Sequence, residues 1–342
     1  MDKPHIFIVS PASANANNGN WLTASRWAGI LRDRYRVTLA LSWDGTPCDA
    51  MIALHARRSA ASIAGFAAAH PELPLVLALT GTDLYRDIRT DVDGRRSLQL
   101  ANHLIVLQPE GLQELDPELR GRTTVIYQSA RSLKPPDMSL KRRMRHFDVA
   151  MIGHLRHEKD PLTFMRAATH VKSLRIRLLH IGGALDPVFA FHAETTQNAH
   201  PHYRWLGHLP RALTRQRLKR SHLMVIASVM EGGANVIIEA ITSGVPVIAS
   251  DIPGNRGMLG DDYAGYFPLG DSLALARLIE SAATDNAFYA RLQMQCAARA
   301  HLFTPERERT ALLHLMNNLI GSHCRGVEDS WPASMKSKKG YP

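Results

Sequence analysis

The stretch LMVIASVMEGGANVIIEAITSGVPVIAS, residues 223–250, decides the fold of this chain. Both of its ends are continuous apolar runs, which is typical of strands buried on both faces of a parallel sheet. The middle predicts a short helix that starts at Val236 with Asn235 as its N-cap and ends at Gly244. Two buried strands joined by a helix indicate a βαβ unit, in which ligands bind beyond the carboxyl ends of the strands.

Two carboxylates stand out in this stretch. Glu231 follows the first strand, and the pair Gly232-Gly233 after it indicates a tight loop, because glycine adopts positive φ freely. Glu239 lies within the apolar helix, and a buried carboxylate is costly unless it has a partner. The spacing alone leaves a plainer alternative open, in which the segment is an ordinary connection and Glu239 faces solvent.

The same alternation of apolar runs and helical patterns extends over the rest of the chain, and this rhythm predicts doubly wound parallel sheets. In the first half, strands are predicted near 5–10, 35–41, 50–54, 75–79, 103–107 and 124–127. In the second half, they are predicted near 147–152, 176–181, 203–206, 223–227, 246–250 and 265–268. Besides the helix of the opening stretch, helices are predicted near 21–34, 59–70, 160–172, 211–220, 272–284, 286–302 and 305–320.

The rhythm is interrupted once, at Pro135-Pro136 and the basic run that follows them. We therefore expect an N-terminal domain over 1–140 and a second domain over 141–320, with a cleft between them. From 321 onward the chain turns polar, which predicts a loose tail over 321–342.

Composition argues against a membrane-spanning protein, a disulfide-bonded protein and a metal-binding protein. The chain has 342 residues, 45% of them hydrophobic, and no apolar run long enough to span a membrane. An N-terminus without signal-peptide character and three widely spaced cysteines favour a cytoplasmic protein without disulfides. The histidines lack metal-ligand spacing, so we expect no metal site.

The net charge of +10 favours an anionic partner. The cations are spread along the chain without the aromatic interleaving of a single-strand binder, and there is no zinc-finger pattern. Small anionic substrates therefore rank above nucleic acid. The oligomeric state cannot be read from the sequence.

Three further motifs follow predicted strands in the second half. Gly153 opens a loop with Arg156 and Lys159, whose spacing would let both cations clamp a diphosphate, although most such pairs are surface charge. Gly182-Gly183 is a glycine turn that allows close approach of backbone to a ligand. The turn at Leu209 is a possible pocket for a base.

In this order, the motifs resemble those of the retaining family 4 glycosyltransferases, which have the GT-B architecture: two Rossmann-like doubly wound α/β domains that face a central cleft. The resemblance implies a UDP-sugar donor and no metal or other cofactor. It places the diphosphate on Arg156 and Lys159, the ribose on Glu239 and the uracil at Leu209. Glu231 would contact the donor sugar. Glu231, Arg156 and Lys159 would together be the catalytic residues. The remaining donor-binding residues would be Gly153, Gly182, Gly183, Gly232, Gly233, Ala234 and Asn235.

The N-terminal half departs from the usual members, which carry a Gly-Gly loop after the first strand. Here that loop reads PASANANNGNW (11–21), and further unusual segments are LHARRSA (54–60), LTGTDLYRD (79–87) and YQSA (127–130). Together they resemble a narrower group, the selenosugar synthases (SenB) of selenoneine biosynthesis. That resemblance implies that selenophosphate attacks C1 of UDP-N-acetylglucosamine (UDP-GlcNAc) or UDP-glucose. A selenosugar forms, and UDP and phosphate are released.

Selenophosphate is small and highly anionic, so its binding site would need cations and N–H donors. The reaction would have less need of a strong general base, because selenium is already negatively charged. For Asp83, capping of a turn and catalysis are equally good interpretations. The predicted acceptor-binding residues are Asn17, Asn18, Gly19, His55, Arg57, Arg58, Thr80, Gly81, Thr82, Asp83, Gln128 and Arg131.

Other functions remain open at this point. The same donor site would serve a family 4 glycosyltransferase that acts on a lipid or carbohydrate hydroxyl. A regulator that binds UDP-sugar without turnover would keep the same binding residues. A nucleic-acid binder fits least well.

Overall fold

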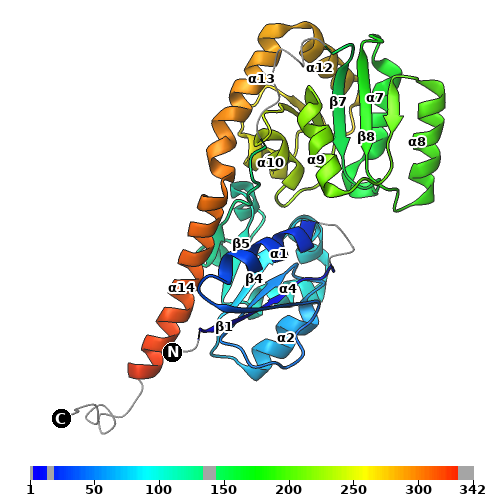
Figure 1. Cartoon of the computed structure of the whole chain (residues 1–342). Helices are drawn as coiled ribbons and strands as arrows, with labels where there is room; N and C mark the ends of the chain where they lie inside the picture. Colours follow the sequence, from blue (N-terminus) through cyan, green and yellow to red (C-terminus); the bar gives the residue numbers. More distant parts are fainter. Residues whose placement is uncertain (1–2, 14–18, 134–143, 330–342) are drawn as a thin grey trace. The chain divides into compact units, whose positions relative to one another are not determined.

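The computed structural model describes residues 3–13, 19–133 and 144–329, which form two compact units (Figure 1). The first unit consists of the described residues of Met1–Leu107, Leu115–Ile126 and Glu306–Pro342. The second consists of those of Gln108–Glu114 and Tyr127–Pro305.

The first unit is built on a six-stranded parallel sheet with the order β2-β1-β3-β4-β5-β6. Its strands are β1 (His5–Val9), β2 (Arg36–Ala40), β3 (Ala50–Leu54), β4 (Leu75–Leu79), β5 (His103–Val106) and β6 (Thr123–Val125). Its helices are α1 (Gly19–Leu31), α2 (Ala60–Ala69), the π-turn η2 (Asp83–Asp87), α3 (Ile88–Thr90), α4 (Val92–Leu100), α5 (Pro117–Arg120) and α14 (Pro305–Asp329).

The second unit is built on another six-stranded parallel sheet, with the order β12-β11-β10-β7-β8-β9. Its strands are β7 (Phe147–Ile152), β8 (Ile176–Ile181), β9 (Tyr203–Trp205), β10 (Leu223–Ile226), β11 (Val247–Ser250) and β12 (Tyr266–Phe267). Its helices are α7 (Pro161–His170), α8 (Pro187–Ala199), α9 (Arg211–Arg220), α10 (Asn235–Ile241), α11 (Pro253–Leu259), α12 (Ser272–Thr284) and α13 (Asn286–Arg299). Shorter 3-10 turns are η3 (Pro109–Leu112), η4 (His157–Lys159) and η5 (Ala300–Phe303).

The predicted α/β class with two doubly wound units is confirmed, because both sheets are parallel and contain every predicted strand. In the second unit the chain runs outward from β7 to β9 on one side and from β10 to β12 on the other. The order of strands therefore reverses between β7 and β10, and such a switch point is where open α/β sheets bind ligands.

The division into units differs from the predicted domains at the C-terminal helix. The helix α14 belongs to the first unit, where Leu312 and Met316 pack in one core with Trp27 of α1. Glu308 fixes this contact, since it accepts hydrogen bonds from Trp27 Nε1 at 2.8 Å and from Arg26 Nε at 2.8 Å. The apolar stripe of α14 predicted a helix but could not reveal which core would bury it.

Two other predicted boundaries also shift. Residues 127–133 belong to the second unit, although the N-terminal domain was expected to reach 140. The predicted tail from 321 is instead helical as far as Asp329, because α14 continues without a break. The expected linker falls largely on 134–143, which lies outside the described residues.

A buried histidine in the second sheet gives a prediction about pH. His180 on β8 is fully buried, its Nδ1 lies 2.8 Å from the hydroxyl of Tyr203, and burial lowers its pKa to about 3. An unfolded chain binds a proton there near pH 6.5, whereas the folded chain does not until the pH is far lower. Folding stability should therefore fall by about 2 kcal/mol between pH 7 and pH 5 through this residue alone.

Urea unfolding of the natural protein and of His180→Leu at pH 7 and pH 5 measures this contribution. The natural protein should lose about 2 kcal/mol more stability than the variant over that interval, because the variant lacks the titrating group. Equal losses in the two proteins would contradict the prediction.

Candidate active site

The loops after β7 and β10 meet at the switch point of the second sheet. Lys159 Nζ donates to Glu231 Oε1, and Ser228 Oγ donates to the same oxygen at 2.6 Å. The two loops are also joined through their backbones, since the Val229 N–H donates to the Glu158 carbonyl at 3.0 Å. The side chains of Lys159 and Glu231 are only 19% and 11% exposed, so this ion pair is well shielded from water.

Arg156 lies on the same loop as Lys159 but remains more accessible. Its side chain is 41% exposed, and its Nε lies 3.8 Å from Glu158 Oε2. Asp160, with φ at 43°, ends the η4 turn and caps α7 by accepting from the Thr163 N–H. The loop thus presents one shielded cation and one accessible cation beyond the end of β7.

The buried carboxylate of Glu239 is paired with arginines, as its place in an apolar helix requires. It is buried, and its Oε1 lies 2.9 Å from Arg211 Nη2 and 3.9 Å from Arg215 Nε. Both arginines come from α9, one turn apart. The alternative of a solvated Glu239 is therefore excluded, and the structure adds two arginines that sequence analysis did not select.

The start of α10 differs from the prediction. The helix begins at Asn235, and the N-cap position is held by Ala234, which makes no side-chain capping bond. Asn235 is therefore the first helical residue, and its side chain does not cap the helix. The predicted end is close to the observed one, since Gly244 follows α10 with φ at 68°.

Two glycines allow backbone segments of the site to touch. A Cβ on Gly182 would lie 1.8 Å from the Gly153 carbonyl oxygen, and a Cβ on Gly254 would lie 1.9 Å from the Glu231 carbonyl oxygen. Any larger residue at Gly182 or Gly254 would push these backbone segments apart. Gly254 lies on α11, a helix that sequence analysis did not predict.

The crowding at Gly182 predicts that Gly182→Ala destabilises the protein by about 2–3 kcal/mol, because the new methyl group collides with backbone. Gly183→Ala is the matched control, since its Cβ would meet its nearest neighbour, the Cβ of His208, at an ordinary 3.5 Å. Urea unfolding of both variants tests this, and a similar loss of stability for the two would contradict it.

The turn around Leu209 is joined to the glycine turn. The Gly182 N–H donates to the Gly207 carbonyl at 2.9 Å, and Trp205 Nε1 donates to the Gly182 carbonyl at 2.8 Å. The rings of His154 and His208 stack beside these turns, with centroids 5.8 Å apart and planes 1° from parallel. Burial lowers the pKa of His154, which favours the neutral ring at pH 7. Sequence analysis did not select this histidine pair.

A second polar cluster lies in the first unit, beyond the ends of β3 and β4. His55 is buried, has φ at 74°, and its Nε2 lies 3.0 Å from Thr82 Oγ1. Its Nδ1 accepts the Arg58 N–H at 3.3 Å, which places the ring proton on Nε2. Burial lowers the pKa of His55, so the ring is neutral at pH 7 and orients Thr82.

Asp83 holds the two strand ends together. It is fully buried, and its carboxylate accepts the backbone N–H groups of Ala56 at 3.0 Å, Thr80 at 2.9 Å and Gly81 at 2.8 Å. These bonds favour capping over catalysis as the role of Asp83. They also shape the loops that carry Arg57 and Thr82.

Asp87 forms ion pairs with two arginines in the same cluster. Its Oδ2 lies 2.9 Å from Arg57 Nε, and its Oδ1 lies 3.1 Å from Arg86 Nε. Burial acts to raise the pKa of Asp87, but hydrogen bonds from the two arginines outweigh it, so the pKa lies below its usual value. Asp83 and Asp87 are the two ends of the π-turn η2, a rare element that is frequent at functional sites. Arg86 and Asp87 were not among the predicted site residues.

Not all predicted acceptor residues belong to this cluster. Gly19 begins α1, Gln128 and Arg131 belong to the second unit, and Asn17 and Asn18 lie outside the described residues. The Arg131 carbonyl accepts from Arg215 Nη2 at 2.6 Å, which places it near Glu239. The cluster brings together His55, Arg57, Arg58, Thr80, Gly81, Thr82 and Asp83.

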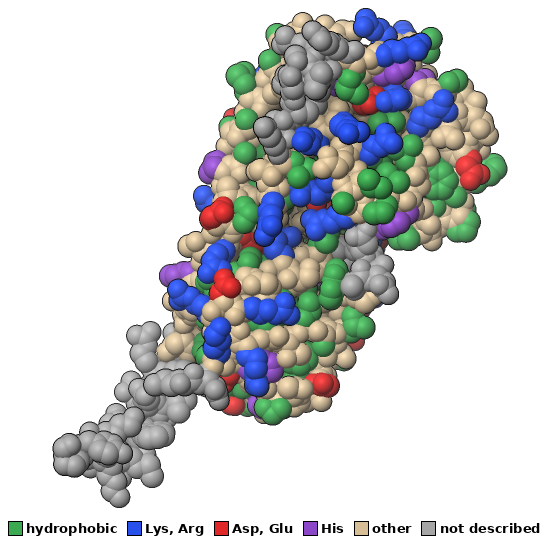
Figure 2. Space-filling view, viewed as in Figure 1, with side chains coloured by type: hydrophobic (Ala, Val, Ile, Leu, Met, Phe, Trp, Pro, Cys, Tyr) green, Lys and Arg blue, Asp and Glu red, His purple; other side chains and the backbone are tan. Residues whose placement is uncertain are grey.

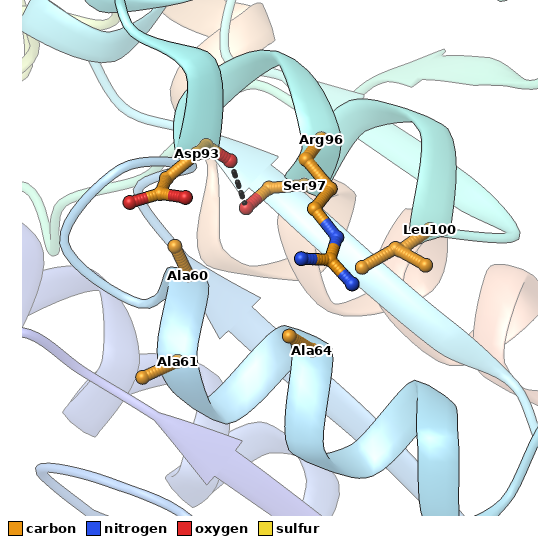
Figure 3. Close-up of a pocket in the computed structure, with 7 residues that line it drawn as sticks. All are labelled: Ala60, Ala61, Ala64, Asp93, Arg96, Ser97 and Leu100. Atoms are coloured by element: carbon orange, nitrogen blue, oxygen red, sulfur yellow. Dashed lines mark hydrogen bonds between the residues drawn. The ribbon is translucent and has the colours of Figure 1, made fainter.

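A small pocket lies between α2 and α4, with a volume of about 140 Å³ (Figure 3). Three alanines of α2 form one wall, and Asp93, Arg96, Ser97 and Leu100 form the other. Ser97 Oγ donates to the carbonyls of Ala56 and Asp93, both at 2.8 Å, so it serves to tie α4 to the loop after β3. We interpret the pocket as a depression left by small side chains.

The surface view agrees with the basic composition, since Lys and Arg side chains are far more abundant than acidic ones on the face shown in Figure 2. Among the described residues, no helix is both long and apolar enough to cross a membrane.

Comparison with known proteins finds sequence similarity to glycosyltransferases in the second half of the chain. Residues 138–301 match the family model described as glycosyl transferases group 1. Glycosyltransferase 1 domain-containing protein 1 of Xenopus tropicalis is 30% identical over 167 residues, which is 48% of this chain and 46% of the relative. A UDP-Gal:alpha-D-GlcNAc-diphosphoundecaprenol alpha-1,3-galactosyltransferase of Escherichia coli is 28% identical over 142 residues, which is 39% of this chain and 35% of the relative. The chain thus matches less than half the length of these curated relatives.

Solved structures resemble nearly the whole chain. HepE of Anabaena, in complex with UDP and glucose, aligns with a TM-score of 0.72 at 18% identity and covers 92% of this chain and 99% of its own. Sucrose-phosphate synthase of Thermosynechococcus elongatus aligns with a TM-score of 0.75 at 15% identity and covers 94% of this chain and 100% of its own. The predicted GT-B fold is confirmed. The chain therefore has the GT-B fold, and its residues 138–301 match the glycosyl transferases group 1 family.

Proposed function

We propose that this chain is a glycosyltransferase that joins selenophosphate to C1 of UDP-GlcNAc or UDP-glucose. The observation that carries the donor half of the proposal is the ion pair of Lys159 with Glu231 at the switch point of the second sheet. The match to glycosyl transferases group 1 covers this site, and HepE, a structural neighbour, was solved in complex with UDP-glucose.

In the donor site, Arg156 and Lys159 bind the diphosphate and stabilise the charge that develops on departing UDP. The positive charge of Arg156 and Lys159 neutralises the diphosphate, which a metal ion would otherwise do. Glu239, held by Arg211, accepts hydrogen bonds from the ribose hydroxyls. Glu231 contacts the donor sugar, together with the loop from Gly232 to Asn235, and the turn at Leu209 receives the uracil.

In the acceptor site, the cationic cluster of the first unit binds selenophosphate. Arg57 and Arg86 are partly exposed cations fixed by Asp87, and Thr82 is a hydroxyl fixed by His55. Such a set suits a small tetrahedral oxyanion. Selenium forms a bond to C1 while the bond from C1 to the UDP oxygen breaks, and water then cleaves the Se–P bond to give the selenol and phosphate.

A second candidate is transfer of the sugar to a lipid or carbohydrate hydroxyl. The E. coli relative favours it, since its name states that it acts on a diphosphoundecaprenol acceptor. The two candidates share the donor site and differ in whether turnover requires an anionic acceptor.

Release of UDP under anaerobic conditions separates these candidates. We expect release from UDP-GlcNAc or UDP-glucose to accelerate with selenophosphate, and less so with thiophosphate, but not with phosphate or with simple sugars. Acceleration by a hydroxyl acceptor alone would support the second candidate. UDP binding without turnover under any of these conditions would support a regulator.

A further inference from the structure

Ser228 lies where β10 ends and is fully buried. Its hydroxyl donates to Glu231 Oε1 at 2.6 Å, a short bond to a charged acceptor. Sequence analysis did not select Ser228, because a serine after a strand has no distinctive pattern of its own.

The backbone beneath Ser228 is fixed by a chain of buried polar contacts. Ser250 Oγ, at the end of β11, donates to the Ser228 carbonyl at 2.6 Å. Asn255 Nδ2 in turn donates to the Ser250 carbonyl at 2.9 Å, and Ser250 and Asn255 are both fully buried. On the other side, Gly254 lets the backbone of α11 touch the Glu231 carbonyl. Ser228 is therefore set in rigid surroundings and can hold its partner in one orientation.

Ser228 and Lys159 contact the same oxygen of Glu231, which leaves Oε2 for a ligand. The two partners differ once a donor is bound. Lys159 is a cation, and a diphosphate nearby would compete with Glu231 for its ammonium group. Ser228 is neutral and buried, so its bond to Glu231 does not depend on the diphosphate.

We infer that Ser228 is a positioning residue that holds Glu231 in place when Lys159 turns to the diphosphate, so that Oε2 meets the donor sugar. This inference rests on the proposed role of Glu231 in binding the sugar. It predicts that Ser228 affects recognition of the sugar and not of the nucleotide.

The test compares the affinities for UDP and for the UDP-sugar that the natural protein binds more tightly, UDP-GlcNAc or UDP-glucose. Isothermal titration is carried out on the natural protein, Ser228→Ala, Ser221→Ala and Glu231→Gln, with thermal unfolding of each. Ser221→Ala is the matched control, because it also removes a buried serine hydroxyl, one that donates to the Arg217 carbonyl at the opposite end of β10. We expect Ser228→Ala and Glu231→Gln to weaken UDP-sugar binding about tenfold relative to UDP, and Ser221→Ala to leave that ratio within about twofold.

The other outcomes overturn the inference in different ways. If Glu231→Gln changes the ratio but Ser228→Ala behaves like Ser221→Ala, Ser228 has only a structural role, and the proposed role of Glu231 is kept. If neither Glu231→Gln nor Ser228→Ala changes the ratio, both roles are wrong. A natural protein that binds neither UDP nor a UDP-sugar would overturn the proposed function and this inference with it.

Discussion

Replacing Lys159 with methionine is expected to lower kcat for UDP release by a factor of about 10²–10³. Lys159 is the shielded cation of the proposed donor site, and its charge would stabilise the diphosphate most strongly as the bond to C1 breaks. Methionine keeps an unbranched side chain of similar length, so the fall in kcat reports the effect of removing the charge alone. Steady-state kinetics with saturating UDP-sugar and selenophosphate measures the effect.

Lys172→Met is the matched control, since Lys172 follows α7, at the opposite end of that helix from the site. It should change kcat by less than about twofold. A Lys159→Met enzyme with nearly natural kcat would contradict the assignment of the diphosphate to this loop.

The second large effect is expected at the acceptor cluster. Arg57→Ala should lower kcat/KM for selenophosphate by about 100-fold, because a charge-assisted contact to the oxyanion is lost. The dissociation constant for UDP should stay unchanged, since Arg57 is not among the residues proposed to bind the donor. Arg57→Lys should recover only part of the activity, because lysine lacks the planar fork of arginine.

Arg36→Ala serves as the control for this experiment. Arg36 is an exposed arginine of the same unit at the start of β2, whereas Arg57 follows the end of β3. The control should keep the natural KM for selenophosphate. An unchanged KM in Arg57→Ala as well would remove Arg57 from the acceptor site and direct the search to Arg58 and Arg86.

Strands such as β3, β4 and β10 were predictable because each is a short continuous apolar run, and the local pattern is sufficient to recognise such a run. Among the described helices of seven residues or more, three were not predicted, for physical reasons. Among the residues of α8, only Ala193 is buried, so no apolar stripe marks it. In α4 the buried residues are Gly94, Ser97 and Leu98, and in α11 they include two glycines, which argue against a helix.

The proximity of Lys159 and Glu231 could be predicted, because each lies in a loop that follows a strand of the same sheet. The need of Glu239 for a partner could be predicted as well, because it is a carboxylate in an apolar helix. The partners of these residues could not be predicted. Ser228, Arg211 and Arg215 contact the two glutamates only because β10, α9 and α10 pack together in three dimensions. The same holds for Asp87, which is matched to Arg57 only once the loops after β3 and β4 lie side by side. Capping by Asn235 was wrong because the helix begins one residue earlier than its composition indicates.

The central claim is that this chain forms a carbon–selenium bond at C1 of a UDP-sugar. The most direct test incubates the purified protein anaerobically with UDP-GlcNAc or UDP-glucose and ⁷⁷Se-labelled selenophosphate, and identifies the products by mass spectrometry and ⁷⁷Se NMR. We predict a selenosugar with selenium coupled to the C1 proton, formed only when both substrates are present and accompanied by equal amounts of UDP and phosphate. UDP-sugar binding without any selenium-containing sugar would contradict the claim.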